Sequence, residues 1–468
     1  MEKVKSVFYL HKKIIIVICI SLLIKLFALI LILTGDSSKI MLSDSPSYEE
    51  PAISLLDSGK FVESFENPDK PMFKRTPGYP GFIALVYFFF GQNRGAILVF
   101  QIILSVISIL LLYRILLKLG IQNIAVIAGI LLAADTLQCY YSLVVLSESL
   151  FSFLLLFSVY FGVTLCLEQK NKKKSAFLLG LFMALATLVR PISYYLVFPI
   201  VIGMIIFHKQ ISFRSWKELF LSTCFMLMPF FILVGGWQVR NNVIVGTFEY
   251  SGIKSKNMLL FRAAGVLAKK EHRTLSEVQK EFTEQYYMNS DLSDAEREKQ
   301  VNDTAMKIIF DNPLEYSQIA GEGIVSTLIA PGHRSLLDLL GFDINFESKK
   351  TGYDKQSLDY YLNTFVFSGR IIELCLLVFL FFFYLFIYGF SVLGCINLIR
   401  NRKSLTMPIV HLFIIGIIIF LLLLGAGPEA NSRFRTPLMP LFIFYATIGF
   451  DYLTKYFQRK RKEKKGIK

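Results

Sequence analysis

Long apolar runs follow one another along most of this 468-residue chain, and they constrain its fold more than any other feature. An α-helix of about 20 apolar residues crosses a bilayer core, and irregular backbone cannot face the hydrocarbon. Since 54% of the residues are hydrophobic, the sequence predicts an all-α polytopic membrane protein. To within about two, we expect about ten spans, at residues 14–34, 94–117, 122–140, 148–167, 176–190, 193–207, 218–237, 371–397, 406–426 and 437–454.

Positive charges lie in short clusters between these runs, which indicates cytoplasmic loops. An even number of spans puts both basic termini in the cytoplasm. The first run has no small-residue cleavage site and is predicted to be a retained span in the inner or plasma membrane. The net charge of +15 therefore indicates topology and not nucleic-acid binding, since no basic patch has a folded domain behind it. The clusters are Lys3 to Lys13, Lys170 to Lys174, His208 to Lys217, Arg400 to Lys403 and Lys455 to Lys468.

Two long segments, 35–93 and 238–370, then face outward. The longer segment holds the capping boxes Thr274-Leu-Ser-Glu277 and Ser293-Asp-Ala-Glu296, and Pro313 after Asn312, which are typical helix starts. We expect a small, mostly helical extracytoplasmic domain there. The predicted parts are an N-terminal transmembrane module with the first outer loop (1–237), the extracytoplasmic domain (238–370), and C-terminal transmembrane helices with a basic cytoplasmic tail (371–468).

The cysteines and histidines indicate no metal site and no cofactor. The six cysteines lie in or beside apolar runs without CxxC spacing, and the five histidines are scattered. Neither a disulfide framework nor a zinc site is predicted.

Charged residues gather instead on the predicted outer side of the membrane. Ionisable residues at membrane depth are costly and are functional candidates by default. Every outer segment contributes some of them: Asp44, Glu49, Glu50, Lys74, Arg75, Glu148, Arg190, Arg240, Glu429, Arg433 and Arg435.

Asp44 stands soon after the first span. Tyr48, Ala52, Leu55 and Leu56 repeat after it at helical spacing, which predicts a short amphipathic helix at the membrane surface. Asp44 would cap this helix. A capping aspartate and a catalytic base are compatible, since both need a fixed carboxylate.

Lys74 and Arg75 precede a rigid turn that ends at Pro80. Guanidinium groups match phosphate oxygens in bidentate geometry, so a phosphate site is one interpretation. Snorkelling of these side chains to the interface is the other.

Glu148 opens a span, where a carboxylate also suits the helix dipole. Arg190-Pro191 ends another span, and a broken helix is tolerated only against protein or a water-filled cavity, which favours a functional role. The turn with Glu429, Arg433 and Arg435 is too charged for a bland connector. Lys25, in the middle of the first span, either snorkels or pairs inside the bundle.

In this order, these stretches resemble the GT-C superfamily of integral-membrane glycosyltransferases, most of all the branch with protein O-mannosyltransferases and bacterial aminoarabinose transferases of lipid A. The resemblance spans most of residues 40–445. Its motifs are Asp44-xxx-Tyr48-xxx-Ala52-xx-Leu55-Leu56, Arg75-x-Pro-Gly-Tyr79-Pro80, Ser147-Glu148-Ser149-Leu150-Phe151, Leu188-Val-Arg190-Pro191, Trp237-xx-Arg240-Asn241 with Gly246, and Glu429-xxx-Arg433-Phe-Arg435-xx-Leu438-x-Pro440.

The resemblance implies a GT-C-like bundle and inverting transfer of a sugar from a polyprenyl-phosphate donor to a lipid, protein or cell-envelope glycan, without a metal. Asp44 would be the base, with Glu148 as a second catalytic acid. Ser45 stands where some relatives have an acid next to the aspartate, so the helper is Glu148 or an acid such as Glu49. The donor phosphate would be held by Arg75, Lys74, Arg190, Arg240, Arg433 and Arg435, with Tyr48, Tyr79 and Glu429 as supporting residues.

Two other functions fit a polytopic chain with buried charges. A transporter or flippase of lipid-linked sugars would have broken helices, but the chain shows no inverted repeat. A surface-glycan polymerase or ligase of another membrane fold would keep outer arginines without needing the helix after Asp44. The sequence names neither the sugar nor the acceptor.

Overall fold

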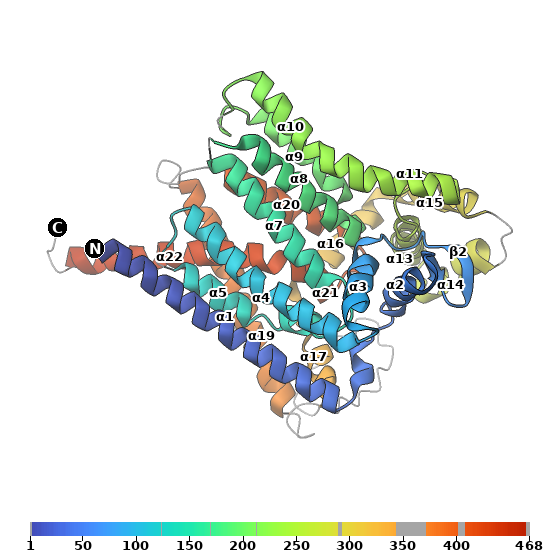
Figure 1. Ribbon diagram of the computed structural model, residues 1–468, viewed down its shortest axis with the longest axis horizontal. Coiled ribbons are helices and arrows are strands. Elements are labelled where there is room, and N and C mark those ends of the chain that lie inside the picture. The colour runs from blue at the N-terminus through green and yellow to red at the C-terminus, as the bar shows by residue number, and fades with distance from the viewer. Residues whose placement is uncertain are drawn as a thin grey trace.

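The computed structural model describes residues 2–122, 124–168, 170–211, 213–288, 293–342, 371–400 and 408–464. These residues are almost entirely helical, as predicted. The start of α1 (Glu2–Thr34) and the end of α22 (Met439–Lys464) lie at one end of the molecule, and α2 (Pro46–Ser58) lies at the other (Figure 1). The ends of the predicted extracytoplasmic domain and of the basic tail, residues 343–370 and 465–468, fall outside the described residues.

Apolar helices form the body of a multi-pass membrane protein. Among the described residues, five helical stretches are long and apolar enough to cross a membrane. The pair of α5 (Ala125–Ala133) and α6 (Thr136–Ser142), bent by 57°, could make a sixth. The five are Lys12–Thr34, Arg94–Lys118, Glu148–Leu167, Trp216–Val245 and Ile371–Leu398. Shorter apolar helices occupy Gly78–Phe90, Pro191–Ile206 and Pro408–Leu424. Each predicted span contains helix, while the number of true crossings stays a prediction.

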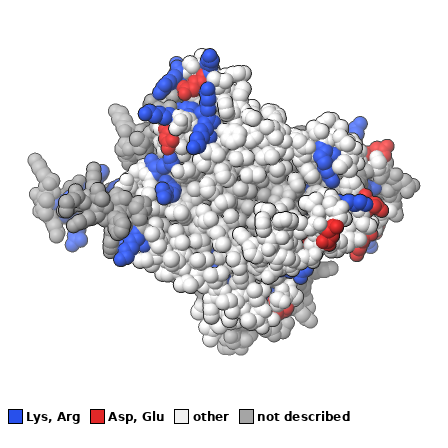
Figure 2. Space-filling model, viewed as in Figure 1, with Lys and Arg blue, Asp and Glu red and all other residues white. Residues whose placement is uncertain are grey.

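The spanning body has a charge-poor middle. On the face shown in Figure 2, charged side chains gather at two ends, and a broad belt without charge lies between them. A belt of this kind is what the hydrocarbon core of a bilayer requires, because a charged side chain there is costly. Besides α1 and α22, the helices of the body are α4 (Arg94–Lys118), α5 (Ala125–Ala133), α6 (Thr136–Ser142), α7 (Glu148–Leu167), α8 (Lys172–Val189), η2 (Pro191–Leu196), α9 (Val197–Ile206), α10 (Trp216–Phe230), η3 (Phe231–Gly235), α19 (Ile371–Arg400) and α20 (Pro408–Leu424).

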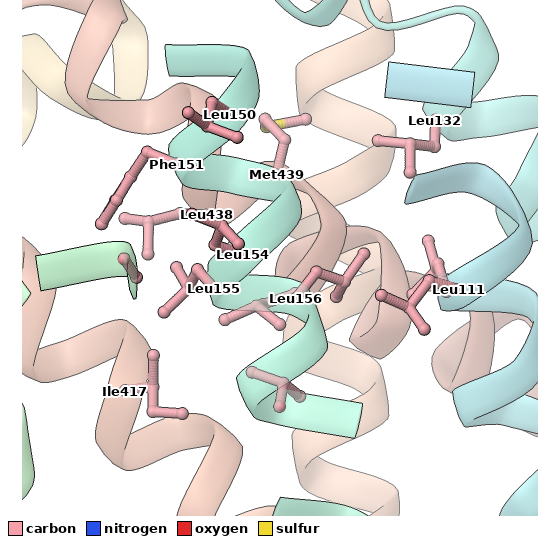
Figure 3. Packing of buried hydrophobic residues seen from close by; sticks show 14 of the residues in the cluster. Leu111, Leu132, Leu150, Phe151, Leu154, Leu155, Leu156, Ile417, Leu438 and Met439 are labelled. Carbon is pink, nitrogen blue, oxygen red and sulfur yellow. The ribbon is translucent and has the colours of Figure 1, made fainter. Parts of the chain in front are cut away.

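Helix α7 lies at the centre of the apolar core. Its Leu150, Phe151 and Leu154 face Leu438 and Met439, which come from the far end of the chain (Figure 3). All five side chains are buried. This packing places the start of α7 beside α21 (Ser432–Arg435) and η7 (Thr436–Leu438).

The first-loop segment, residues 35–93, is folded against the body. The predicted helix after Asp44 is confirmed as α2, with Tyr48 and Ala52 buried, whereas Leu55 and Leu56 are exposed. An antiparallel hairpin was not expected: Glu63 and Lys70 form an ion pair of 2.8 Å across it. The other elements are η1 (Ser37–Ile40), β1 (Val62–Ser64), β2 (Asn67–Pro71) and α3 (Gly78–Phe90).

The large-loop segment, residues 238–342, consists of short helices around a second small core that includes Leu259, Val278 and Val301. Both predicted capping boxes are confirmed, at Thr274 and at Ser293, and Pro313 opens α16 as expected. The helices are α11 (Gly236–Val245), α12 (Ile253–Asn257), η4 (Met258–Ala263), α13 (Ala264–Lys270), α14 (Leu275–Thr283), η5 (Glu284–Met288), α15 (Asp294–Asp311), α16 (Pro313–Ile329) and α17 (His333–Leu339).

Candidate functional site

Five predicted site residues form a continuous row of ion pairs with alternating charge, the charge chain. Arg75, Asp44, Arg433, Glu148 and Arg190 follow one another through ion pairs. They come from the first-loop segment, from α21, from the start of α7 and from the end of α8. Three guanidinium groups and two carboxylates leave one net positive charge, so the cluster as a whole attracts an anion.

Asp44 lies between two guanidinium groups. Its Oδ1 accepts from Arg75 Nη2 at 2.6 Å, and its Oδ2 accepts from Arg433 Nη1 at 2.7 Å. Burial by itself would raise the pKa of Asp44, but Arg75 and Arg433 outweigh it and lower the pKa to about 2. The carboxylate is therefore ionised at neutral pH.

The predicted capping role of Asp44 is wrong. The N-cap of α2 is Ser45, and no side chain caps the helix. Ser45 Oγ instead donates to Val145 O at 2.8 Å and accepts from Leu42 N, which fixes the loop against the body. Since the aspartate is not used by the helix end, both of its oxygens face the arginines.

Glu148 is the fully buried member of the charge chain. Its Oε1 accepts from Arg190 Nη1 and from Arg433 Nε. Its Oε2 is buried and has no hydrogen-bond partner among the described residues. A buried carboxylate is stable only when it is paired, so Glu148 holds the two arginines in place.

Local sequence explains the direction of Arg190. Pro191 disfavours helical backbone at the residue before it, and Arg190 is extended, with φ −139° and ψ 122°. Helix α8 therefore ends at Val189. The Arg190 side chain then reaches across to α7 rather than running along its own helix.

The turn that carries Arg75 fits against this break. A Cβ on Gly78 would lie 2.6 Å from the carbonyl carbon and oxygen of Leu188. The glycine thus permits the start of α3 to touch the end of α8, because any side chain would push the two apart. Arg75 and Arg190 are brought to the same place by this contact.

Two predicted tyrosines support Arg75. Its guanidinium carbon lies 4.6 Å from the ring centroid of Tyr48, and Tyr48 packs edge-on against Tyr79 with centroids 5.1 Å apart. Tyr79 is anchored by its hydroxyl, which donates to Gln101 Oε1 at 2.6 Å. Ser47, which the sequence did not single out, accepts from Arg75 Nε at 3.0 Å.

Arg240 and Arg435 lie outside the charge chain. Arg240 donates to Met72 O at 2.5 Å and stacks on Trp237, which ties α11 to the first-loop segment. Arg435 is fully buried and packs on Tyr384. Its guanidinium donates to the backbone carbonyls of Thr327, Leu328 and Ala330.

Glu429 and Lys25 have partners outside the charge chain, and Lys74 lines a cavity. Glu429 Oε1 pairs with Arg262 Nε at 3.3 Å, which joins the turn before α21 to η4. Lys74 is half-buried and lines a cavity between the first-loop and large-loop segments. Lys25 pairs inside the bundle, as one interpretation had it, and donates to Ser105 Oγ at 2.5 Å.

The two acids considered as helpers are separated by the fold. Glu49 is buried and accepts from Tyr87 and, through both oxygens, from Arg94 at 2.7 and 2.8 Å. Glu148, in contrast, shares Arg433 with Asp44. Of the two, only Glu148 lies in the charge chain.

Residues 69–237 match the family model described as dolichyl-phosphate-mannose-protein mannosyltransferase. No curated protein is significantly similar in sequence.

Solved structures of an archaeal oligosaccharyltransferase share the fold at low sequence identity. The oligosaccharyltransferase AglB of Archaeoglobus fulgidus, solved with an inhibitory peptide and a dolichol-phosphate, is 11% identical with a TM-score of 0.50, covering 97% of this chain and 52% of that one. The apo enzyme from the same organism is 13% identical, with the same score and coverage. ArnT of Cupriavidus metallidurans, bound to undecaprenyl phosphate, is 12% identical with a TM-score of 0.44, over 93% of this chain and 76% of that one. The chain spans about half the length of the oligosaccharyltransferase.

Proposed function

We propose that this chain, which has the GT-C fold and resembles the protein O-mannosyltransferase branch of that superfamily, is an inverting glycosyltransferase. It would take a sugar from a polyprenyl-phosphate donor and transfer it to a lipid, protein or cell-envelope glycan on the outer face of the membrane. Both termini would be cytoplasmic. The observation that carries the proposal is the placement of an ionised, half-buried aspartate between two arginines, one of which it shares with the buried Glu148.

The proposed reaction is a single displacement at the anomeric carbon. The acceptor oxygen forms a bond to this carbon while the bond to the donor phosphate oxygen breaks, and the electron pair stays on the phosphate. Asp44 takes the proton of the acceptor hydroxyl. Guanidinium groups stabilise the charge that grows on the leaving phosphate, and an inverting displacement needs no nucleophilic carboxylate.

The ion pairs of Asp44 give donor binding a second effect. With a pKa of about 2, Asp44 is a weak base, and a general base works best with a pKa near the working pH. A donor phosphate bound to Arg433 or Arg75 would replace Asp44 as the partner of that guanidinium. The Asp44 pKa would then rise, so that donor binding prepares the base.

The arginines divide into two groups under this proposal. Arg75, Arg190 and Arg433 are the donor-phosphate ligands, since they already meet at the carboxylates. Arg240 and Arg435 hold the surrounding segments through backbone carbonyls. Glu148 positions Arg190 and Arg433 and is not itself the base.

The test is turnover by the purified protein on a panel of polyprenyl-phosphate sugars, with crude membrane glycolipid and glycan as acceptors. Wild type should consume one donor, and Asp44→Asn should lose on the order of 10²- to 10⁴-fold in kcat, the usual contribution of a general base. Asp57→Asn, an exposed aspartate of α2, serves as the control and should keep full turnover.

Two results would overturn the proposal. Full turnover by Asp44→Asn would remove the base. If wild type consumes no donor but moves lipid-linked sugar between leaflets of liposomes, the chain is a flippase.

A further inference from the structure

A cavity of about 440 Å³ opens where the first-loop segment meets the large-loop segment. Its size falls within the range of small-molecule sites, roughly 300–1,000 Å³. Ser43, which precedes Asp44, and Ser47, three residues after it, both line the cavity. Ser47 also bonds the Nε of Arg75. The cavity therefore adjoins the proposed base.

The acidic side chains of this cavity already have partners. Glu63 pairs with Lys70 at 2.8 Å, and Glu50 Oε2 accepts from Phe65 N at 3.0 Å. Glu298 accepts from the hydroxyl of Ser255.

Two lysines, Lys74 and Lys256, also line this cavity. Within the part of the chain that the structure describes, neither Lys74 nor Lys256 forms an ion pair with a carboxylate. Burial, Arg75 and Lys256 together lower the pKa of Lys74 against the opposing effect of Glu63 and Asp44. Two half-buried cations that repel each other are stabilised when an anion binds between them.

We infer that this cavity is the acceptor subsite and that it takes an acceptor glycan carrying an anionic group, a phosphate or a carboxylate, held by Lys74 and Lys256. This rests on the proposed function, since it places the acceptor hydroxyl beside Asp44. Under the proposed function, the arginines of the charge chain hold the donor phosphate, and this cavity does not. Lys74 thus moves from the donor side, where the sequence motif put it, to the acceptor side.

The test uses the full-length protein in nanodiscs and two probes, a trisaccharide with one phosphate monoester and the same trisaccharide without it. Titration calorimetry should show tighter binding of the phosphorylated probe. Lys256→Gln should weaken that binding by on the order of tenfold or more, as expected for one lost charge-assisted hydrogen bond, and Lys256→Arg should restore most of it. Binding of the neutral probe should stay the same.

Lys254→Gln is the matched control. Lys254 stands on the same helix but pairs with Glu249 at 3.2 Å and does not line this cavity. Its replacement should leave the binding of both probes unchanged.

Three outcomes decide the inference. Equal binding of the two probes by wild type would overturn it, whatever the turnover. If Lys256→Gln weakens polyprenyl phosphate as much as the phosphorylated trisaccharide, the cavity holds the donor phosphate and the inference is wrong. If wild type binds the phosphorylated probe selectively but transfers no sugar from any donor, the anion subsite stands and the proposed transferase fails.

Discussion

Replacing Glu148 by Gln tests whether the charge chain holds the site together. The variant keeps the shape of the side chain and one accepting oxygen, but it removes the charge that Arg190 and Arg433 share. Removing one partner of a buried ion pair costs about 3–5 kcal/mol. We expect about 3 kcal/mol, the low end, because the amide still accepts one hydrogen bond and Arg433 keeps Asp44. Glu148 itself is 0% exposed, so water cannot replace the lost pairing.

Turnover should fall together with stability. With Arg190 and Arg433 no longer fixed, the donor phosphate would sit in a shifted place, and a shift of about 1 Å can cost on the order of 10²-fold in rate. The assays are thermal unfolding in detergent, where the apparent Tm should fall by on the order of 5 °C, and single-donor kinetics at equal folded protein. The donor KM should change little, since the net positive charge of the cluster rises.

Glu49→Gln provides the matched comparison. Glu49 is also buried and also pairs with an arginine, but it lies outside the charge chain. It should lose stability by a similar amount while the folded fraction keeps its turnover. If Glu148→Gln unfolds at the wild-type temperature and turns over at the wild-type rate, the charge chain does not organise the site.

Three further changes have clear expected results. Gly78→Ala should lower both apparent Tm and kcat, because its Cβ would meet the backbone of α8, whereas Gly81→Ala, with nothing within 4 Å, should be silent in both measurements. Arg435→Met should cost about 3 kcal/mol in thermal unfolding but leave kcat of the folded fraction within about twofold, since Arg435 donates to the backbone carbonyls of α16 and packs on Tyr384, outside the charge chain; lost turnover at an unchanged Tm would return it to the donor site. The stabilising effect of Asp44 should be complete above about pH 5 and lost as pH falls from about 4 to about 2, because its folded pKa of about 2 lies below its ordinary value. Thermal unfolding of wild type and of Asp44→Asn, measured against pH, should show the difference in stability between them disappearing only in that range.

Features that depend on neighbouring residues could be predicted from the sequence. The helix starts at Thr274, Ser293 and Pro313 follow from local hydrogen bonding and from the fixed φ of proline, and the structure has them. The end of α8 before Pro191 has the same origin. The family resemblance, which depends on the order of such short motifs, is confirmed as well.

Pairings across the chain could not be predicted in this way. Arg433 and Asp44 are 389 residues apart, and only the packed bundle brings them together. Yet one constraint was available: residues two apart on an α-helix point in directions about 200° apart. Arg433 and Arg435 therefore could not both face one phosphate from the same turn, and the structure turns Arg435 toward α16.

The site also depends on when its parts are made. Asp44, Arg75, Glu148 and Arg190 are synthesised early, but they form two separate ion pairs until Arg433 joins them from α21. During biosynthesis, a chain halted before α21 would hold Asp44 and Glu148 without Arg433, the arginine that pairs with both. Under the proposed function, catalytic competence would therefore arise only once α21 has been made, and a truncated product inserted in the membrane would not consume lipid-linked sugar.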